Sequence, residues 1–360
     1  MVRTLDLFSG CGGFSLGAHG AGMRTVLAVD VDSILSSSFE TNFPGSKVHL
    51  GDVAKLTRPV LAKLLPSGVD AVIGGAPCQA FSEIGANDPT DPRRKLVRQF
   101  FRVVAALDPA FFVFENVRGL TFDKNIGELQ AGLRALPSHW RVLEPTVVDA
   151  SDFGAPTRRR RVIVFGFNTR KASVPIIEDL VEPVEKRTTV QDAISDLTDA
   201  REVEPTSTGF RTWTYARNAT LSAYAQKMRN STGRFTGHME TTHTKPTLER
   251  FAKVKPGGVD AVGRYPRLEW EGLCPTLRAG TGSDRGSYQA VRPIHPESHR
   301  VITPREAARL QGFPDWFQFH PTVWHSCRMI GNSVSPIMAE VLLSRAVAAA
   351  GLRSVDIAAE

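Results

Sequence analysis

The first half of the chain alternates short apolar runs with segments in which apolar residues recur at helical spacing. The runs predict strands at Thr4–Phe8, Thr25–Val29, Ala71–Gly74, Phe111–Glu115, Val142–Val148 and Arg161–Phe165. The spacing predicts helices at Phe14–Ala21, Ile34–Asn42, Leu96–Leu107 and Ile126–Leu136. Strands that alternate with helices in this way indicate an α/β fold with a doubly wound, mostly parallel sheet.

The last two predicted strands are connected differently from the others. Only Asp149–Arg160 separates them, and this segment has no helical pattern. A short connection without a helix is typical of antiparallel neighbours, so we expect a hairpin. The start of the second strand would then lie at the sheet edge where the parallel strands end.

The periodic pattern weakens after about residue 170. Residues 171–300 are polar and rich in Thr, Arg, Pro and Gly, which favours loops. Helical spacing returns over Ile337–Ala350. We therefore predict two domains, a larger one formed by residues 1–190 and 325–360 and a smaller, loop-rich one formed by residues 191–324.

Composition narrows the class of protein. A chain of 360 residues has room for two domains and a sizeable core. No apolar run reaches the roughly 20 residues that span a bilayer, and the N-terminus lacks a signal peptide's apolar stretch, so we expect a cytoplasmic protein with no membrane partner. The 4 cysteines are far apart and the 9 histidines form no H-E-x-x-H pattern, so we expect neither disulfides nor a metal. The net charge of +7 fits a solvated surface or a polyanionic partner equally well.

A glycine-rich turn follows the first predicted strand. Residues 8–13 read Phe-Ser-Gly-Cys-Gly-Gly and lead into the first predicted helix. Glycines allow a ligand to approach the backbone, and Asp30 ends the second strand, where an acid is able to bind ribose hydroxyls. Taken alone, the turn fits tight packing as well as nucleotide binding. Its spacing departs from G-x-G-x-x-G, which disfavours a dinucleotide.

A thiol, an acid and a run of arginines complete the candidate chemistry. Cys78 follows one predicted strand, Glu115 ends another, and Arg158–Arg161 begin the last. A lone cysteine is usually a small buried residue, and an acid at such a place could cap a helix. A thiol and an acid at one sheet edge are also the groups that nucleophilic and acid catalysis require.

These motifs, in this order, resemble the DNA cytosine-5 methyltransferases. The resemblance spans residues 3 to about 345, with no family signature over about 185–270. It rests on the glycine turn and on the stretches 74–82, 115–117, 157–161, 276–277, 300–314 and 330–336. Thr157 stands where the family usually has the glutamine of Gln-x-Arg-x-Arg, which leaves that glutamine's packing role open.

The resemblance implies a Rossmann-like, S-adenosylmethionine-dependent methyltransferase fold with a smaller target-recognition domain. Its catalytic residues would be Cys78 as the nucleophile at cytosine C6, Glu115 at N3, Asn116 bracing the loop, Arg161 at O2 and Arg159 ordering the catalytic loop. The residues that bind the cofactor would be Phe8, Gly10, Gly12, Gly13, Asp30, Asp52, Pro77, Asn332 and Val334. The residues that bind the substrate would be Gln79, Ser82 and Thr276.

The implied substrate is a cytosine flipped out of double-stranded DNA. The enzyme would act as a monomer, either in a restriction-modification system beside an endonuclease of the same site or as a solitary methylase. Candidate DNA contacts are Arg211, Arg217, Arg229 and Arg234, although such residues more often contact phosphates or solvent than bases.

Three alternatives remain at this point. One branch of the family methylates tRNA, but it tends to be compact where this chain has its long polar segment. A non-catalytic DNA-binding relative is disfavoured by the presence of Cys78, Glu115 and Arg161. A nicotinamide-dependent oxidoreductase is disfavoured by the glycine spacing.

Overall fold

The chain folds into two compact units. The computed structural model describes residues 1–77, 81, 90–184, 187–203, 210–216, 220–280 and 292–353. The first unit consists of residues 1–149, 160–183 and 338 onward, and the second of residues 150–159 and 184–337. Each unit is therefore assembled from separate stretches of chain, and the chain changes unit after residues 149, 159, 183 and 337.

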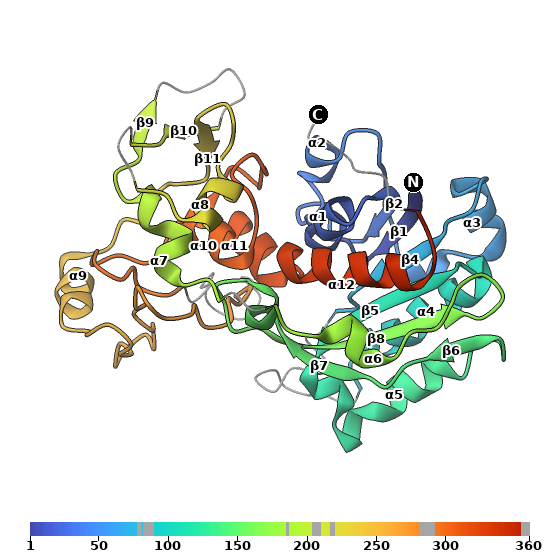
Figure 1. Ribbon diagram of the computed structural model, residues 1–360. Helices are drawn as coiled ribbons and strands as arrows, with labels where there is room; N and C mark the ends of the chain where they lie inside the picture. Colours follow the sequence, from blue (N-terminus) through green and yellow to red (C-terminus); the bar gives the residue numbers. More distant parts are fainter. Residues whose placement is uncertain are drawn as a thin grey trace. The chain divides into compact units, whose positions relative to one another are not determined.

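The described residues of the first unit contain an eight-stranded sheet (Figure 1). Its strands are β1 (Val2–Leu7), β2 (Met23–Asp30), β3 (Lys47–Leu50), β4 (Ala71–Gly74), β5 (Phe111–Val117), β6 (Trp140–Val142), β7 (Thr146–Asp149) and β8 (Arg160–Asn168). The order is β3-β2-β1-β4-β5-β8-β6, with β7 also paired to β8, and β1 to β5 are parallel. The predicted doubly wound, mostly parallel sheet is confirmed. In such sheets ligands bind beyond the carboxyl ends of the strands, where the order reverses.

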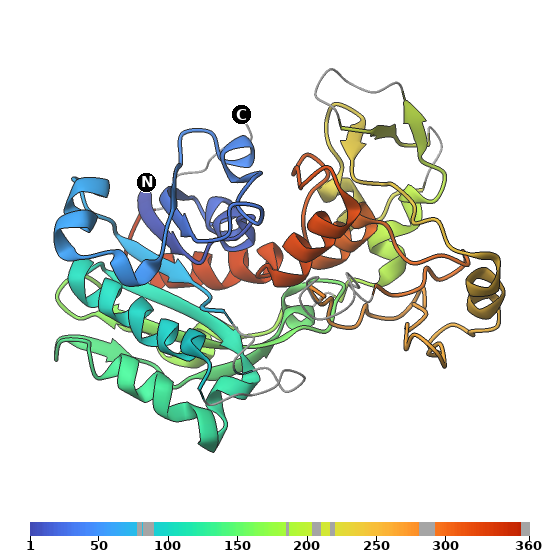
Figure 2. The same ribbon diagram turned by 180° about the vertical axis from the view of Figure 1, so that it is seen from behind.

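Helices lie on both faces of this sheet. They are α1 (Gly13–Gly20), α2 (Phe39–Asn42), α3 (Arg58–Leu64), α4 (Leu96–Leu107), α5 (Asp123–Leu133), α6 (Ile177–Val181) and α12 (Pro336–Ala349). Helices α4 and α5 cover the face that is in front in Figure 2, and α12 lies on the other face. Aromatic rings of α4 and β5 pack at centroid distances of 4.9 to 5.9 Å, through Phe100, Phe101, Phe112 and Phe114. This buried aromatic cluster fixes the strand that carries Glu115.

Strand β8 runs antiparallel to β5, β6 and β7, as the hairpin prediction requires. Val117 pairs with Arg161, and Glu115 pairs with Ile163. The beginning of β8 therefore lies beside the end of β5, and the prediction is confirmed.

The predicted helix Ile34–Asn42 is wrong over its first half. Only α2 is helical, and residues 33–38 form turns. The Asp32 carboxylate accepts the N–H groups of Ile34 and Leu35 at 3.0 Å, while Ser36 Oγ donates to Asp32 O at 2.9 Å. Asp and Ser side chains that bond to nearby backbone compete with helix formation.

The predicted strand Val142–Val148 is two strands rather than one. Both β6 and β7 pair with β8, but the pairing shifts by one residue between Val142↔Gly166 and Thr146↔Ile163. Pro145 lies in the break and has no N–H to donate to the neighbouring strand. The extra residue forms the kind of irregularity that bends a strand.

The described residues of the second unit contain a small antiparallel sheet and several short helices. The sheet has the order β11-β10-β9, from β9 (Arg201–Val203), β10 (Thr212–Thr214) and β11 (Arg234–Thr236). The helices are α7 (Val190–Ile194), α8 (Ala223–Met228), α9 (Lys245–Ala252), α10 (Pro304–Gln311) and α11 (Val323–Asn332).

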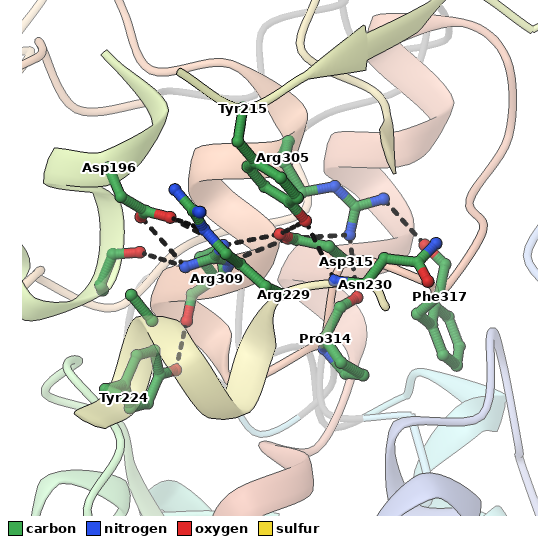
Figure 3. A network of polar contacts seen from close by, with 12 residues as sticks. Asp196, Tyr215, Tyr224, Arg229, Asn230, Arg305, Arg309, Pro314, Asp315 and Phe317 are labelled. Carbon is green, nitrogen blue, oxygen red and sulfur yellow. Dashed lines mark hydrogen bonds and ion pairs between the residues drawn. The ribbon is translucent and has the colours of Figure 1, made fainter. Parts of the chain in front are cut away.

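Two fully buried arginines of α10 organise this second unit (Figure 3). Arg309 forms a two-bond ion pair with Asp315, at 2.7 and 2.6 Å, and lies 3.3 Å from Asp196. Arg305 donates to the carbonyl oxygens of Thr236, Pro314 and Phe317 at 2.8 to 2.9 Å. Burial lowers the pKa of Arg305, whereas the carboxylates around Arg309 outweigh burial and raise its pKa. Protein oxygens thus take the place of water as the hydrogen-bond acceptors of both guanidinium groups.

The same network extends from α10 to the end of β10 (Figure 3). The Tyr215 hydroxyl donates to Asp315 Oδ2 at 2.5 Å and accepts the N–H of Asn230 at 3.0 Å. Arg229 pairs with Asp196 at 2.8 Å and lies 4.1 Å above the Tyr215 ring. The stretch 300–314 therefore contains the two buried arginines that connect α10 to several other segments of the second unit.

Candidate active site

A buried ion pair lies where β5 ends and β8 begins. Arg161 Nε donates to Glu115 Oε1 at 2.8 Å, and the two side chains are only 11% and 9% exposed. The antiparallel register of β5 and β8 brings these residues together. Gly75 leaves space beside the carboxylate, because a Cβ at that position would lie 3.0 Å from Glu115 Oε2.

Asn116 ties this strand to the segment that precedes Cys78. Its side chain is fully buried, and Nδ2 donates to Ala76 O at 3.0 Å. Asn116 Oδ1 accepts the N–H of Val117 at 2.9 Å. Ala76 is followed by the half-buried Pro77. Cys78, Gln79 and Ser82, which were predicted from the sequence as nucleophile and substrate contacts, lie outside the described residues.

Phe81 anchors the chain just beyond Cys78. Its ring is buried, and the guanidinium carbon of Arg94 lies 4.7 Å from the ring centre. Arg94 Nη2 donates to Asn125 Oδ1 at 2.8 Å, and Asn125 Nδ2 donates to Gly119 O at 2.6 Å. Of these supporting residues, only Phe81 has a signal in the sequence, through its place in the stretch 74–82.

The glycine-rich turn begins with a strained residue. Phe8 has φ 60, a left-handed conformation that is rare for a bulky side chain and occurs at ligand sites. Gly12, with φ 95, precedes α1, and a Cβ there would lie 2.4 Å from the ring of Phe43. The sequence therefore needs glycine at position 12, while Gly13 begins the helix. The first turn of α1 contains no acidic residue, and no side chain caps it.

Asp30 holds this turn at the end of β2. Its Oδ2 accepts the N–H of Gly10 and its Oδ1 accepts the N–H of Asp32, both at 2.8 Å. Burial raises the pKa of Asp30, and these hydrogen bonds oppose the rise. Asp52 follows β3 on the exposed surface, and its Oδ1 accepts the N–H of Ala54 at 2.8 Å. Each carboxylate oxygen retains a lone pair for a further donor.

A buried acid lies below the turn, in β1. Ser15 Oγ donates to Asp6 Oδ2 at 2.6 Å, and Thr25 Oγ1 donates to Ser15 Oγ at 3.0 Å. Burial raises the pKa of Asp6 to about 7. Asp6 gives no signal of its own in the sequence, because it lies inside an apolar run.

The four consecutive arginines alternate in exposure, as residues of an extended chain do. Arg158 and Arg160 are exposed, whereas Arg159 and Arg161 are buried. Arg159 belongs to the second unit, where it donates to the carbonyl oxygens of Leu277 (3.3 Å), Gly331 (3.2 Å) and Ser333 (2.7 Å).

Residues 156–159 run beside residues 274–277 within the second unit. Cys274 N donates to Pro156 O at 2.9 Å, and Arg158 N donates to Cys274 O at 2.8 Å. Thr157 is fully buried, and its hydroxyl donates to Cys274 O at 3.1 Å. The exposed Thr276 donates its hydroxyl to Arg158 O at 2.6 Å. Thr157 thus fills the expected glutamine position with a short, hydrogen-bonded side chain.

The two remaining predicted cofactor residues also belong to the second unit. Asn332 is exposed at the end of α11, and Val334 is buried two residues later. Within the described ranges, no group of three His, Cys, Asp or Glu residues is arranged to hold a metal ion. No helix in these ranges is long and apolar enough to cross a bilayer.

The ion pair, the glycine turn and the arginine run agree with a comparison against known families. The family model described as C-5 cytosine-specific DNA methylase matches residues 2–348. The chain belongs to the C-5 cytosine-specific DNA methylases. The resemblance recognised in the sequence is therefore confirmed, and the chain is a DNA (cytosine-5-)-methyltransferase.

Individual proteins that are similar to this methylase are also methyltransferases by name. The Type II methyltransferase M.XorII of Xanthomonas oryzae is 41% identical, over 94% of this chain and 82% of its own length. M.DdeI of Desulfomicrobium norvegicum is 31% identical, over 96% of this chain and 88% of its own. A prophage-encoded E. coli protein assigned as a DNA modification methyltransferase has a TM-score of 0.83 and 35% identity, covering 97% of this chain and 99% of that one. The S. pombe Dnmt2 methyltransferase shares the fold, with a TM-score of 0.64 at 18% identity, over 96% of this chain and 98% of that one.

Proposed function

We propose that this methylase transfers a methyl group to C5 of a cytosine flipped out of duplex DNA, through a covalent bond between Cys78 and C6. The observation that carries the proposal is the buried Glu115–Arg161 pair at the carboxyl edge of the sheet. Asn116, next to Glu115, bonds to the chain two residues before Cys78. An acid, a fixed cation and the segment that bears a thiol therefore share one edge.

The reaction follows from the chemistry of the ring. Cytosine C5 is a weak nucleophile, and addition of the Cys78 thiolate at C6 places electron density on C5. Glu115 would donate a hydrogen bond or a proton to N3 as this addition proceeds, while Arg161 holds O2 and orients the carboxyl group. After C5 is methylated, its proton leaves to a base and the thiolate departs from C6, which restores the aromatic ring.

S-adenosylmethionine, when bound, would supply the electrophilic methyl group. The residues at the ends of β1, β2 and β3 fit such a molecule. The strained Phe8 offers an aromatic ring for adenine, Asp30 offers a half-buried carboxylate for ribose hydroxyls, and Asp52 offers an exposed carboxylate for an amine. We also assign cofactor binding to Gly10, Gly12, Gly13, Pro77, Asn332 and Val334.

We assign Arg159 a positioning role rather than contact with the base. Its guanidinium holds the carbonyl oxygens of Leu277 and Ser333, which follow Thr276 and Asn332. Those two residues are the proposed DNA and cofactor contacts. One buried cation therefore fixes the backbone of both segments.

The larger domain would carry catalysis and the smaller one target recognition. The names of the Type II relatives support a role in a restriction-modification system, with an endonuclease of the same site as partner. In the other form of the proposal the methylase is solitary, and in both forms it would be a monomer in the cytoplasm.

The proposal predicts a trapped covalent complex. Fluorine at C5 cannot leave as a cation, so duplex DNA with 5-fluorocytosine at the target site should remain bound to Cys78 after methyl transfer. Denaturing electrophoresis should show this complex only when S-adenosylmethionine is present, and the Cys78→Ala variant should not form it. Bisulfite sequencing of DNA from cells that express the protein identifies the target site beforehand.

Two results would contradict the proposal. One is turnover of the natural site without any adduct on the fluorinated site, which would exclude the addition step. The other is methylation of tRNA but not of duplex DNA, which would favour the RNA-modifying branch.

Binding of the cofactor should raise the thermal midpoint of the protein by mass action. At a concentration of 100 times Kd, a ligand that binds only the folded state adds about 2.7 kcal/mol. Asp30→Ala should reduce this increase, because the ribose hydroxyls and the Gly10 N–H lose their acceptor. Differential scanning fluorimetry checks this, with Glu40→Ala on α2 as a control and NAD as a ligand that should have no effect. Equal stabilisation of the wild type and of Asp30→Ala by S-adenosylmethionine would show that Asp30 does not contact the cofactor.

A further inference from the structure

One face of the small sheet in the second unit carries a row of two arginines and a threonine. In the antiparallel register, Thr214 of β10 pairs with Arg201 of β9 on one side and with Arg234 of β11 on the other. Directly paired residues point to the same face of a sheet. Arg201, Thr214 and Arg234 therefore form one row, which we call the basic row.

The opposite face of this sheet packs against the rest of the second unit. Its middle row consists of Glu202, Trp213 and Phe235, of which Trp213 and Phe235 are buried. The basic row is thus on the outer face. Arg201 and Arg234 are exposed, and neither side chain forms an ion pair or hydrogen bond within the described part of the chain.

Two other arginines that the sequence suggested as DNA contacts form ion pairs with carboxylates of the second unit, Arg211 on the surface and Arg229 with a buried partner. Arg211 forms a two-bond ion pair with Glu202, at 2.6 and 2.5 Å. Arg229 is paired with the buried Asp196 and stacked on Tyr215. Arg217 lies outside the described residues. Arg234 thus remains a candidate DNA contact, and Arg201 is a second one.

The basic row has the charge of a surface that binds a polyanion. The second row of the same face, Val203, Thr212 and Thr236, adds no acidic side chain, and Thr212 in its middle is buried, so the exposed part of the face is the basic row. Two strand spacings separate Arg201 from Arg234, which is about 10 Å. The major groove is about 12 Å wide and admits a two-stranded ribbon, and a face of three strands is broader than such a ribbon.

The sheet is also held rigidly beneath this face. Arg305 donates to Thr236 O at the end of β11, and Tyr215, directly after β10, is bonded to Asp315 (Figure 3). A preorganised surface loses less conformational freedom on binding than a mobile one.

We propose that the basic row binds the backbone of duplex DNA, with Arg201 and Arg234 each neutralising one phosphate. This inference rests on the proposed function, because it takes duplex DNA as the substrate. It assigns these arginines to affinity and to orientation on the duplex, and leaves the reading of bases to other residues.

The test measures DNA binding by the full-length protein as a function of salt concentration. Each phosphate contact contributes about −0.9 to the slope of log K against log salt. Arg201→Ala with Arg234→Ala should therefore reduce the magnitude of the slope by about 1.8, and should weaken binding to the target duplex and to an unrelated duplex by the same factor. Arg201→Lys with Arg234→Lys should restore the slope, because lysine keeps the charge.

A double variant on the first unit serves as the matched control. Arg24 and Arg141 are exposed, and their strands place them at the sheet edge opposite Glu115. Arg24→Ala with Arg141→Ala removes the same charge and should leave the slope unchanged.

Two outcomes would overturn the inference. An unchanged slope in the alanine variant would exclude phosphate contacts, and a loss of affinity confined to the target duplex would make the arginines base readers. Methylation of duplex DNA by the wild type is measured first. If the wild type methylates DNA and the slope does not change, only this inference fails, whereas a wild type that does not methylate DNA contradicts the proposed function itself.

Discussion

Glu115→Gln is expected to slow methyl transfer by about 10²- to 10⁴-fold, the usual contribution of a positioned general acid. Glutamine keeps the shape of the side chain but has no acidic proton for N3 and no charge for Arg161. The effect should appear in the rate of a single turnover, measured with saturating DNA and S-adenosylmethionine. DNA affinity should change much less, because binding does not require proton transfer.

The same substitution elsewhere gives a matched control for this prediction. Glu128 forms an ion pair with the exposed Arg98 at 2.7 Å, so Glu128→Gln removes a carboxylate that has no proposed role. Its single-turnover rate should equal that of the wild type. If Glu115→Gln also retained the wild-type rate, the role assigned to Glu115 would be wrong.

Arg309→Ala is expected to destabilise the second unit by about 3–5 kcal/mol, because it leaves the buried Asp315 without its two-bond partner, whereas Asp196 keeps its ion pair with Arg229. The side chains of Arg309, Asp315 and Asp196 are at most 1% exposed. Urea unfolding followed by tryptophan fluorescence measures the effect well, since four of the five tryptophans belong to the second unit. The residual methylation activity of this variant should fall with the folded fraction.

An exposed ion pair provides the comparison for Arg309. Arg98 is 50% exposed beside Glu128, and Arg98→Ala should cost no more than about 1 kcal/mol. A loss of similar size in both variants would mean that the buried network of Figure 3 adds little to stability.

The sequence predicted β1, β2, β4, β5 and β8 because these strands are apolar runs with clear ends, whereas the partly exposed β3 was not among the predicted strands. β4 and α4 have the predicted bounds, and the short connection before Arg161 correctly indicated an antiparallel β8. That orientation is what places Arg161 beside Glu115. The position of Glu115 and Arg161 at one sheet edge could thus be predicted from the sequence, because Glu115 lies at the end of one predicted strand and Arg161 at the start of an antiparallel one.

Other features depend on contacts that no local pattern reveals. The strands of the second unit are only three residues long, which is too short for a period of two to be visible. The basic row exists only through their pairing, so Arg201 carried no signal. In the same way, the run Arg158–Arg161 did not predict that Arg159 would bind three carbonyl oxygens of distant segments.

The second unit, to which we assign target recognition, is discontinuous in sequence, and this affects how target specificity could be exchanged between methylases. A chimaera that transplants residues 184–337 alone would leave behind 150–159, which belong to the same unit and pair with 274–277. The carbonyl oxygens of Leu277, Gly331 and Ser333 would then lie beside the arginine segment of the other methylase and not beside Arg159 of their own chain. A graft of the second unit needs both stretches, with junctions at 149/150, 159/160, 183/184 and 337/338, so the ten residues before β8 travel with the second unit rather than with the strand that they precede.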